Sequence, residues 1–95
     1  MKRELIWHVS GTLVGSSCEI GRKNRKFWKL LVSVEGGYLT VYVRADELLP
    51  VAASLEAGDV LEASGTLKPH ADISNAARPL FVDNPSVLRK LPSDS

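Results

Sequence analysis

Residues 27–44 read FWKLLVSVEGGYLTVYVR, and in this stretch apolar and polar residues alternate on both sides of two glycines. Alternation with a period of two is typical of a half-buried strand, so it predicts strands at Phe27–Glu35 and Tyr38–Arg44. Gly36-Gly37 favours a tight hairpin turn between them, because both glycines can take positive φ. The prediction is an antiparallel hairpin with one apolar face and one face of aromatic, polar and basic residues.

Three further strands are expected from similar alternation, at Leu5–Val14, Val60–Lys68 and Arg78–Leu91. Gly11 interrupts the first of these strands and predicts a bulge or a sharp bend. Pro85 lies inside the last strand and predicts a bend there, because proline cannot donate a hydrogen bond to the ladder. The polar stretch Gly15–Lys26, which contains a basic run, is expected to be a connection rather than a strand.

A single helix is predicted over Asp46–Ala57, where apolar residues recur on one side. Pro50 is tolerated only near a helix start and is therefore placed in the first turn, while Gly58 is expected to stop the helix. Residues 69–77 are expected to form a loop. The element order predicts an all-β fold, a five-stranded OB-fold Greek-key barrel with a short helix between strands 3 and 4. An SH3-like barrel has a similar strand count but does not normally have a helix at that place.

Length and composition restrict the class of protein. The chain has 95 residues, of which 44% are hydrophobic and 24% charged, and this predicts one globular domain over residues 1–95 with frayed ends at 1–4 and 92–95. Cys18 is the one cysteine, which excludes an intrachain disulfide framework. No apolar run reaches the roughly 18–20 residues of a membrane span, and no secretory signal is evident, so we expect a cytoplasmic protein.

Three short motifs resemble a known family. Residues 9–13 (VSGTL), 55–67 (LEAGDVLEASGTL) and 81–88 (FVDNPSVL) are similar to the first, fourth and closing strands of bacterial single-stranded DNA-binding proteins. The resemblance extends over about residues 5–91. The 95 residues contain no glycine-rich tail with an acidic tip, and in this they are more similar to primosomal replication protein N. The resemblance implies an OB-fold that binds single-stranded DNA with little sequence preference, in replication, repair or mobile-element maintenance.

A candidate nucleic-acid-binding surface follows from the predicted fold. OB-folds bind on the outer face of strands 2 and 3 and on the flanking loops, and binding without sequence preference needs aromatic faces and a basic groove. The candidates for stacking are Phe27, Tyr38 and Tyr42. The candidates for phosphate contacts are Arg22, Lys23, Arg25, Lys26, Lys29 and Arg44, with Lys68, His70 and Arg78 from a second loop. Acidic residues are expected elsewhere, at Asp46, Glu47, Glu56, Asp59 and Glu62.

Other chemistry finds little support in the residues. His70-Ala71-Asp72 lacks the further ligands of a zinc site, Cys18 has no partner pattern for a nucleophile, and no phosphate-binding glycine motif is present, so we expect no enzyme, metal or cofactor. The expected partners are single-stranded DNA, with RNA as the alternative, and further copies of the chain in a homo-oligomer, with no membrane and no small-molecule substrate. The alternative is an OB-fold protein–protein interaction module, whose docking surface would contain Phe27, Leu31, Tyr38 and Tyr42.

Overall fold

The computed structural model describes residues 5–67, 81–83 and 85–92. Several predictions therefore lie outside the described residues: the frayed ends apart from Pro92, the loop at 69–77, and the binding contributions of Lys68, His70 and Arg78. None of the helices within the described ranges is long and apolar enough to cross a membrane.

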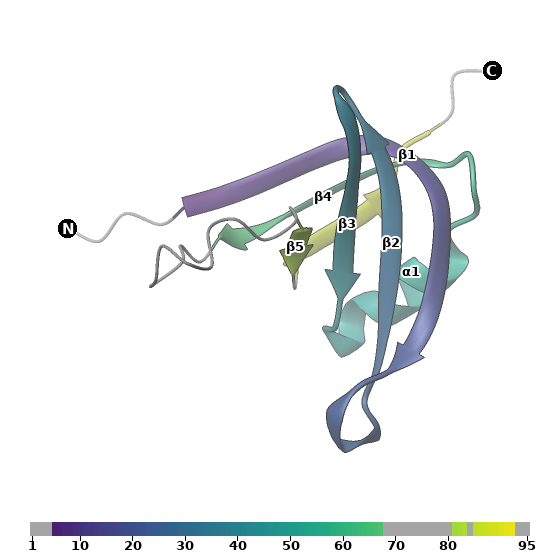
Figure 1. The fold of residues 1–95 in the computed structure, drawn as a ribbon, viewed down its shortest axis with the longest axis vertical. Coiled ribbons are helices and arrows are strands. Elements are labelled where there is room, and N and C mark those ends of the chain that lie inside the picture. Colours follow the sequence, from purple (N-terminus) through teal and green to yellow (C-terminus); the bar gives the residue numbers. More distant parts are fainter. Residues whose placement is uncertain (1–4, 68–80, 84, 93–95) are drawn as a thin grey trace.

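The described chain is mostly β, with one short helix (Figure 1). Its elements are β1 (Leu5–Ile20), β2 (Lys26–Val34), β3 (Gly37–Val43), α1 (Leu49–Ser54), β4 (Val60–Leu67), β5 (Phe81–Asp83) and β6 (Val87–Lys90). The strands form one sheet in the order β5-β3-β2-β1-β4-β6. Neighbouring strands are antiparallel except β3 and β5, which run parallel. The all-β prediction is confirmed at this level.

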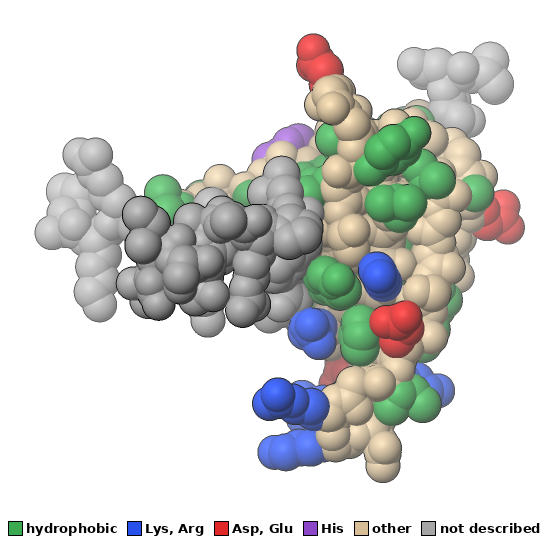
Figure 2. Space-filling view, viewed as in Figure 1, with side chains coloured by type: hydrophobic (Ala, Val, Ile, Leu, Met, Phe, Trp, Pro, Cys, Tyr) green, Lys and Arg blue, Asp and Glu red, His purple; other side chains and the backbone are tan. Residues whose placement is uncertain are grey.

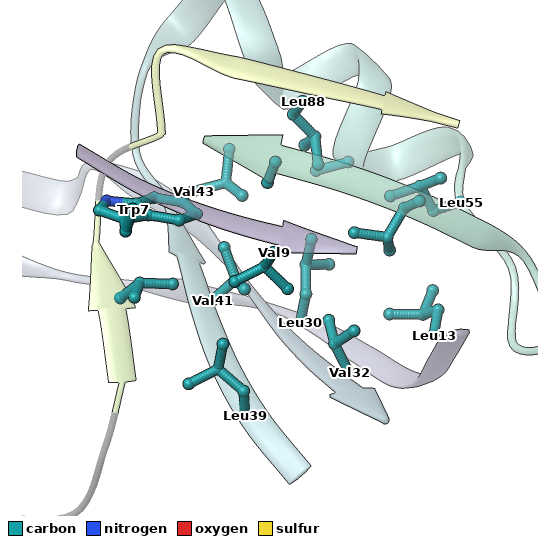
Figure 3. Packing of buried hydrophobic residues seen from close by; sticks show 14 residues of the cluster. Trp7, Val9, Leu13, Leu30, Val32, Leu39, Val41, Val43, Leu55 and Leu88 are labelled. Carbon is teal, nitrogen blue, oxygen red and sulfur yellow. The ribbon is translucent and has the colours of Figure 1, made fainter. Parts of the chain in front are cut away.

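The hairpin of β2 and β3 forms as predicted and lines the core with its apolar face (Figure 3). Leu30, Val32, Val41 and Val43 are completely buried, and they pack with Trp7 and other apolar side chains from β1, β4 and β6. The turn is displaced by one residue from the prediction, because Val34 pairs with Gly37 and leaves Glu35 and Gly36 at the turn. Gly36 has φ +92°, a conformation that glycine adopts at little cost.

Strand β1 is longer than predicted, and the expected connection at Gly15–Lys26 is wrong over its first six residues. β1 continues to Ile20 and pairs with β2 along this whole extension. A register shift between Leu13 and Gly15 reverses which residues face outward. Residues 16–20 are also exposed on both faces. The extension therefore lacks the hydrophobic alternation by which a strand is recognised in a sequence.

Gly11 allows a close approach between strands, and of the two predicted alternatives, a bulge or a sharp bend, the bulge is not at this residue. A Cβ atom at this position would lie 2.3 Å from the backbone oxygen of Ser33. The next residue, Thr12, pairs with both Ser33 of β2 and Val60 of β4. Gly11 thus lies where β1 passes from one partner strand to the other, and the irregularity in pairing comes two residues later.

Helix α1 is shorter than the predicted Asp46–Ala57. A 3-10 turn over Asp46–Leu48 precedes it, and Pro50 lies in its first turn as expected. The helix ends at Ser54 because Leu55 adopts an extended conformation, with its side chain buried in the core. Gly58, at φ +96°, occupies the turn that leads into β4 rather than the end of the helix.

The last predicted strand is divided at Pro85, in agreement with the predicted bend. β5 pairs with β3 and forms one edge of the sheet, and β6 pairs with β4 and forms the opposite edge. Only residues 84–86 separate β5 from β6 in the chain, although these strands form opposite edges of the sheet. The sheet must therefore curl to bring its two edges near each other (Figure 1). The sheet is not closed, because no hydrogen-bonded ladder joins β5 and β6 among the described residues.

Candidate functional site

The outer face of β2 and β3 presents the side chains that the core does not bury. Three pairs of Cα partners cross this face: Lys29 with Tyr42, Leu31 with Thr40, and Ser33 with Tyr38. Directly paired residues of antiparallel strands project to the same side of the sheet. Figure 2 views this side and shows hydrophobic side chains over the strands, with Lys and Arg side chains gathered at one end.

Two aromatic rings and a guanidinium form a contact cluster on this face, which we call the Arg44 cluster. The ring centroids of Phe27 and Tyr42 lie 6.1 Å apart, and the ring planes are tilted by 51°. The Arg44 Cζ atom lies 4.8 Å from the Phe27 centroid and 5.7 Å from the Tyr42 centroid. Both distances are within the roughly 6 Å of a cation–π interaction.

The loop between β1 and β2 carries the basic run and is held by its own backbone. The Gly21 N–H donates to the Arg25 carbonyl at 2.7 Å, and the Arg25 N–H donates to the Arg22 carbonyl at 3.2 Å. Lys23 and Asn24 complete the narrow turn with φ near +58° and +57°. The basic side chains of this loop are exposed, so the loop presents positive charge to solvent.

An open pocket of about 570 Å³ lies between this loop and the end of β3. It brings together six of the predicted site residues: Arg22, Lys23, Arg25, Lys26, Phe27 and Arg44. Gly21 and Asp46 complete the lining. The expectation that acidic residues lie elsewhere is therefore wrong for Asp46. Its position two residues after Arg44 was the available signal, because a turn directly after β3 stays beside that strand's end.

Ion pairing differs between the pocket and the edge of the sheet that β4 and β6 form. Within the described ranges, Arg22, Lys23, Arg25 and Lys26 take part in no ion pair. On β4 and β6, by contrast, Glu62 contacts both Arg89 and His8, and its Oε2 lies 3.6 Å from His8 Nε2. The Lys90 Nζ lies 3.4 Å from Asp59 Oδ1. Among the described residues, these four cations of the pocket are thus not compensated by an ion pair.

Tyr38 and Lys29 lie apart from the pocket. Tyr38 is four positions from Tyr42 along β3, a separation of about 13 Å, and 70% of its surface is exposed. Lys29 borders a second, shallower hollow of about 230 Å³ together with Leu31. Sequence reasoning missed the other residues of this hollow, Gly15, Ser16 and Ser17, because they were assigned to a connection.

Cations beside aromatic rings on one open face suit an anionic ligand that also has flat apolar groups. Within the part of the chain that the structure describes, no group of three or more His, Cys, Asp and Glu residues could hold a metal ion. Comparison with known proteins adds no assignment: no family model matches the chain, and no curated protein matches it significantly.

Proposed function

We propose that this chain binds single-stranded nucleic acid, DNA in preference to RNA, largely without regard to sequence. The observation that carries the proposal is the pocket, where four loop cations without ion pairs among the described residues face Phe27 and Arg44. Phosphates would neutralise the cations, and bases would stack against the outer face of β2 and β3. Duplex DNA keeps its bases stacked inside, so the aromatic part of the site favours a single strand.

We further propose that the fold is an OB-fold barrel of the kind found in bacterial single-stranded DNA-binding proteins and primosomal replication protein N. Three features support this: the parallel pairing of β3 with β5, the antiparallel pairing of β4 with β6, and the change of partner along β1. In such a barrel the outer face of the second and third strands and the first loop form the binding surface. A role in replication, repair or mobile-element maintenance, as a cytoplasmic homo-oligomer, belongs to the same proposal.

The competing proposal is a protein–protein interaction module. Leu31 and Tyr38 favour it, because they are large, they are 39% and 70% exposed, and both lie on the outer face of the hairpin. Apolar side chains of this kind also suit self-association, which would cover part of the same face. The two proposals differ in what the basic loop does, since a docking surface centred on Leu31 does not need it.

Fluorescence anisotropy distinguishes the proposals. A labelled oligo-dT of about 30 nucleotides is titrated with the protein at low and at higher salt, beside the matching RNA and a duplex of equal length. We expect binding that prefers the single strand and weakens steeply with salt. Tyr42→Ala should weaken it about tenfold, whereas Tyr42→Phe, which keeps the ring, should not.

Two outcomes would contradict the proposal: no binding to the single strand at low salt, or equal affinity for the duplex. Sedimentation of the wild-type protein and of Leu31→Asp then tests the alternative. If the wild type self-associates, Leu31→Asp disperses it, and neither protein binds nucleic acid, the outer face is a protein-docking surface.

A further inference from the structure

Arg44 covers the two aromatic rings that the sequence assigns to base stacking. Its guanidinium lies over both rings, 4.8 Å from the Phe27 centroid and 5.7 Å from the Tyr42 centroid. Phe27 and Tyr42 are half-buried, whereas Arg44 is exposed. A base that approaches this face from solvent therefore meets the guanidinium before it meets those ring faces.

The geometry of the two rings also argues against direct stacking on both. Planes tilted by 51° at a centroid distance of 6.1 Å offer no common surface to a flat base. A guanidinium is planar and weakly hydrated, and nucleic-acid bases stack on it as they do on aromatic rings. One guanidinium within reach of both rings is held against them, and because Arg44 is exposed, a base can approach it from solvent.

The register of the hairpin fixes this arrangement. Trp28 pairs with Val43, so continuing the antiparallel register by one step places Arg44 opposite Phe27 on the outer face. Tyr42 lies two residues earlier on the same side of β3. The Arg44 cluster is thus positioned by the backbone pairing of two well-paired strands. Arg44 and Phe27 also line the pocket, so a base on Arg44 places its phosphate near the loop cations.

We propose that Arg44 is the stacking platform for a base of the bound strand, and that Phe27 and Tyr42 are positioning residues that hold its guanidinium. This inference rests on the proposed function and changes the role of Arg44, which the sequence assigned to phosphate contact. The phosphate contacts then come from Arg22, Lys23, Arg25 and Lys26. A base, the guanidinium and a ring form three successive layers on the face of the sheet.

The test separates stacking from charge by using two oligonucleotides of about 15 nucleotides, one of oligo-dT and one of abasic residues with the same phosphates. The ratio of the abasic Kd to the oligo-dT Kd measures what the bases contribute. Arg44→Lys keeps the charge but loses the plane, so it should lower this ratio about tenfold and leave the abasic affinity and its salt dependence unchanged. The control Arg89→Lys makes the same exchange on β6, away from the pocket, and should leave the ratio unchanged.

The positioning role has its own test in Phe27→Leu and Phe27→Tyr. Leucine fills similar space without a π face and should lower the ratio, whereas tyrosine should restore it, with circular dichroism confirming that both variants are folded. A ratio in Arg44→Lys within about twofold of the wild type overturns the inference and returns stacking to the rings. A wild-type ratio of one also overturns it, while leaving the phosphate-binding part of the proposed function intact. Failure of the wild type to bind either oligonucleotide rejects the proposed function itself.

Discussion

The two halves of β1 lie in one continuous strand but have different surroundings. The first half, Leu5–Thr12, pairs with β4 and buries Trp7 and Val9 in the core. The second half, from Leu13 to Ile20, pairs with β2, and beyond Leu13 none of its side chains is buried. The first half is therefore bound to the rest of the fold by its side chains, and the second half mainly by its backbone ladder.

Ion pairs also differ between the surroundings of the two halves of β1. Beside the first half, Glu62 joins His8 and Arg89, and the carboxylate of Asp59 lies near Lys90. Beyond the second half, the loop cations form no ion pairs among the described residues. Because four cations gather on the loop while Glu62 and Asp59 lie beside cations of β6, a chain with a net charge of only +1 still presents a basic patch. Net charge alone thus underestimates how well such a chain can attract an anion.

The largest expected effect comes from the buried half of β1. Trp7 is only 7% exposed and its indole lies against Gly65, so Trp7→Ala leaves a cavity and should lower the free energy of unfolding by about 3–5 kcal/mol. Ile20 is also large and apolar, but it is 69% exposed in the other half. Ile20→Ala should change the stability by less than about 0.5 kcal/mol. Urea denaturation followed by circular dichroism measures both, and equal losses would contradict the division of β1.

A smaller effect is expected from removing charge, and it should fall on binding. Arg25→Ala combined with Lys26→Ala removes two pocket cations, which should weaken binding to oligo-dT about tenfold and reduce the salt slope by about 1.4. Arg89→Ala combined with Lys90→Ala removes the same two residue types from β6, where both are paired with carboxylates. This control should leave the salt slope unchanged and cost less than about 1 kcal/mol of stability.

Anisotropy titrations at several salt concentrations supply both slopes. If the two double variants reduce the salt slope equally, nucleic acid responds to the overall charge of the chain and the basic pocket is not a distinct site.

The sequence was informative wherever local pattern and packing agree. In the hairpin, alternation predicted which residues of β2 and β3 are buried, and the outward set it implied contains all three members of the Arg44 cluster. In the second half of β1, the pattern failed for a physical reason. Leu13 ends the buried series, the register shift reverses the facing of the next residues, and no core covers Ser16–Ile20. Backbone pairing with β2 alone makes this segment a strand, and backbone pairing leaves no periodic signal in the sequence.

Asp46 was misassigned for a different reason. Residue type alone predicts that a carboxylate lies away from a site for an anionic ligand. Its surroundings depend on how β3 ends, where a 3-10 turn brings Asp46 back to the pocket. The position of Arg44 opposite Phe27 depends on the hairpin register, and the sequence mispredicts this register because the turn lies one residue earlier than expected. For Asp46, the closeness to Arg44 along the chain was the one signal of a place beside the pocket.

The smallest expected effect is a pH dependence of stability at the turn before β4. The Glu56 N–H donates to Asp59 Oδ2 at 2.8 Å, and this hydrogen bond, with a further contribution from Lys90, lowers the pKa of Asp59 below its ordinary value. The same turn is tied to β1, because the Leu13 N–H donates to the Asp59 carbonyl and the Gly58 N–H to the Leu13 carbonyl, both at 2.8 Å. Asp59 therefore stabilises the junction between the two halves of β1 through a charge that titrates in acid.

A carboxylate with a lowered pKa in the folded state contributes stability that is complete above its unfolded pKa of about 4 and is lost as the pH falls through the folded value. Asp59→Asn keeps an acceptor for the Glu56 N–H but removes the charge. Its melting temperature should lie below that of the wild type at neutral pH, and the difference should shrink as the pH falls below about 4. Glu19→Gln, the same kind of change at an exposed residue of the second half, should shift the melting temperature little. If the Asp59→Asn difference persists unchanged into acid, the charge of Asp59 does not stabilise this turn, and the paired charges near the first half of β1 contribute less than their geometry indicates.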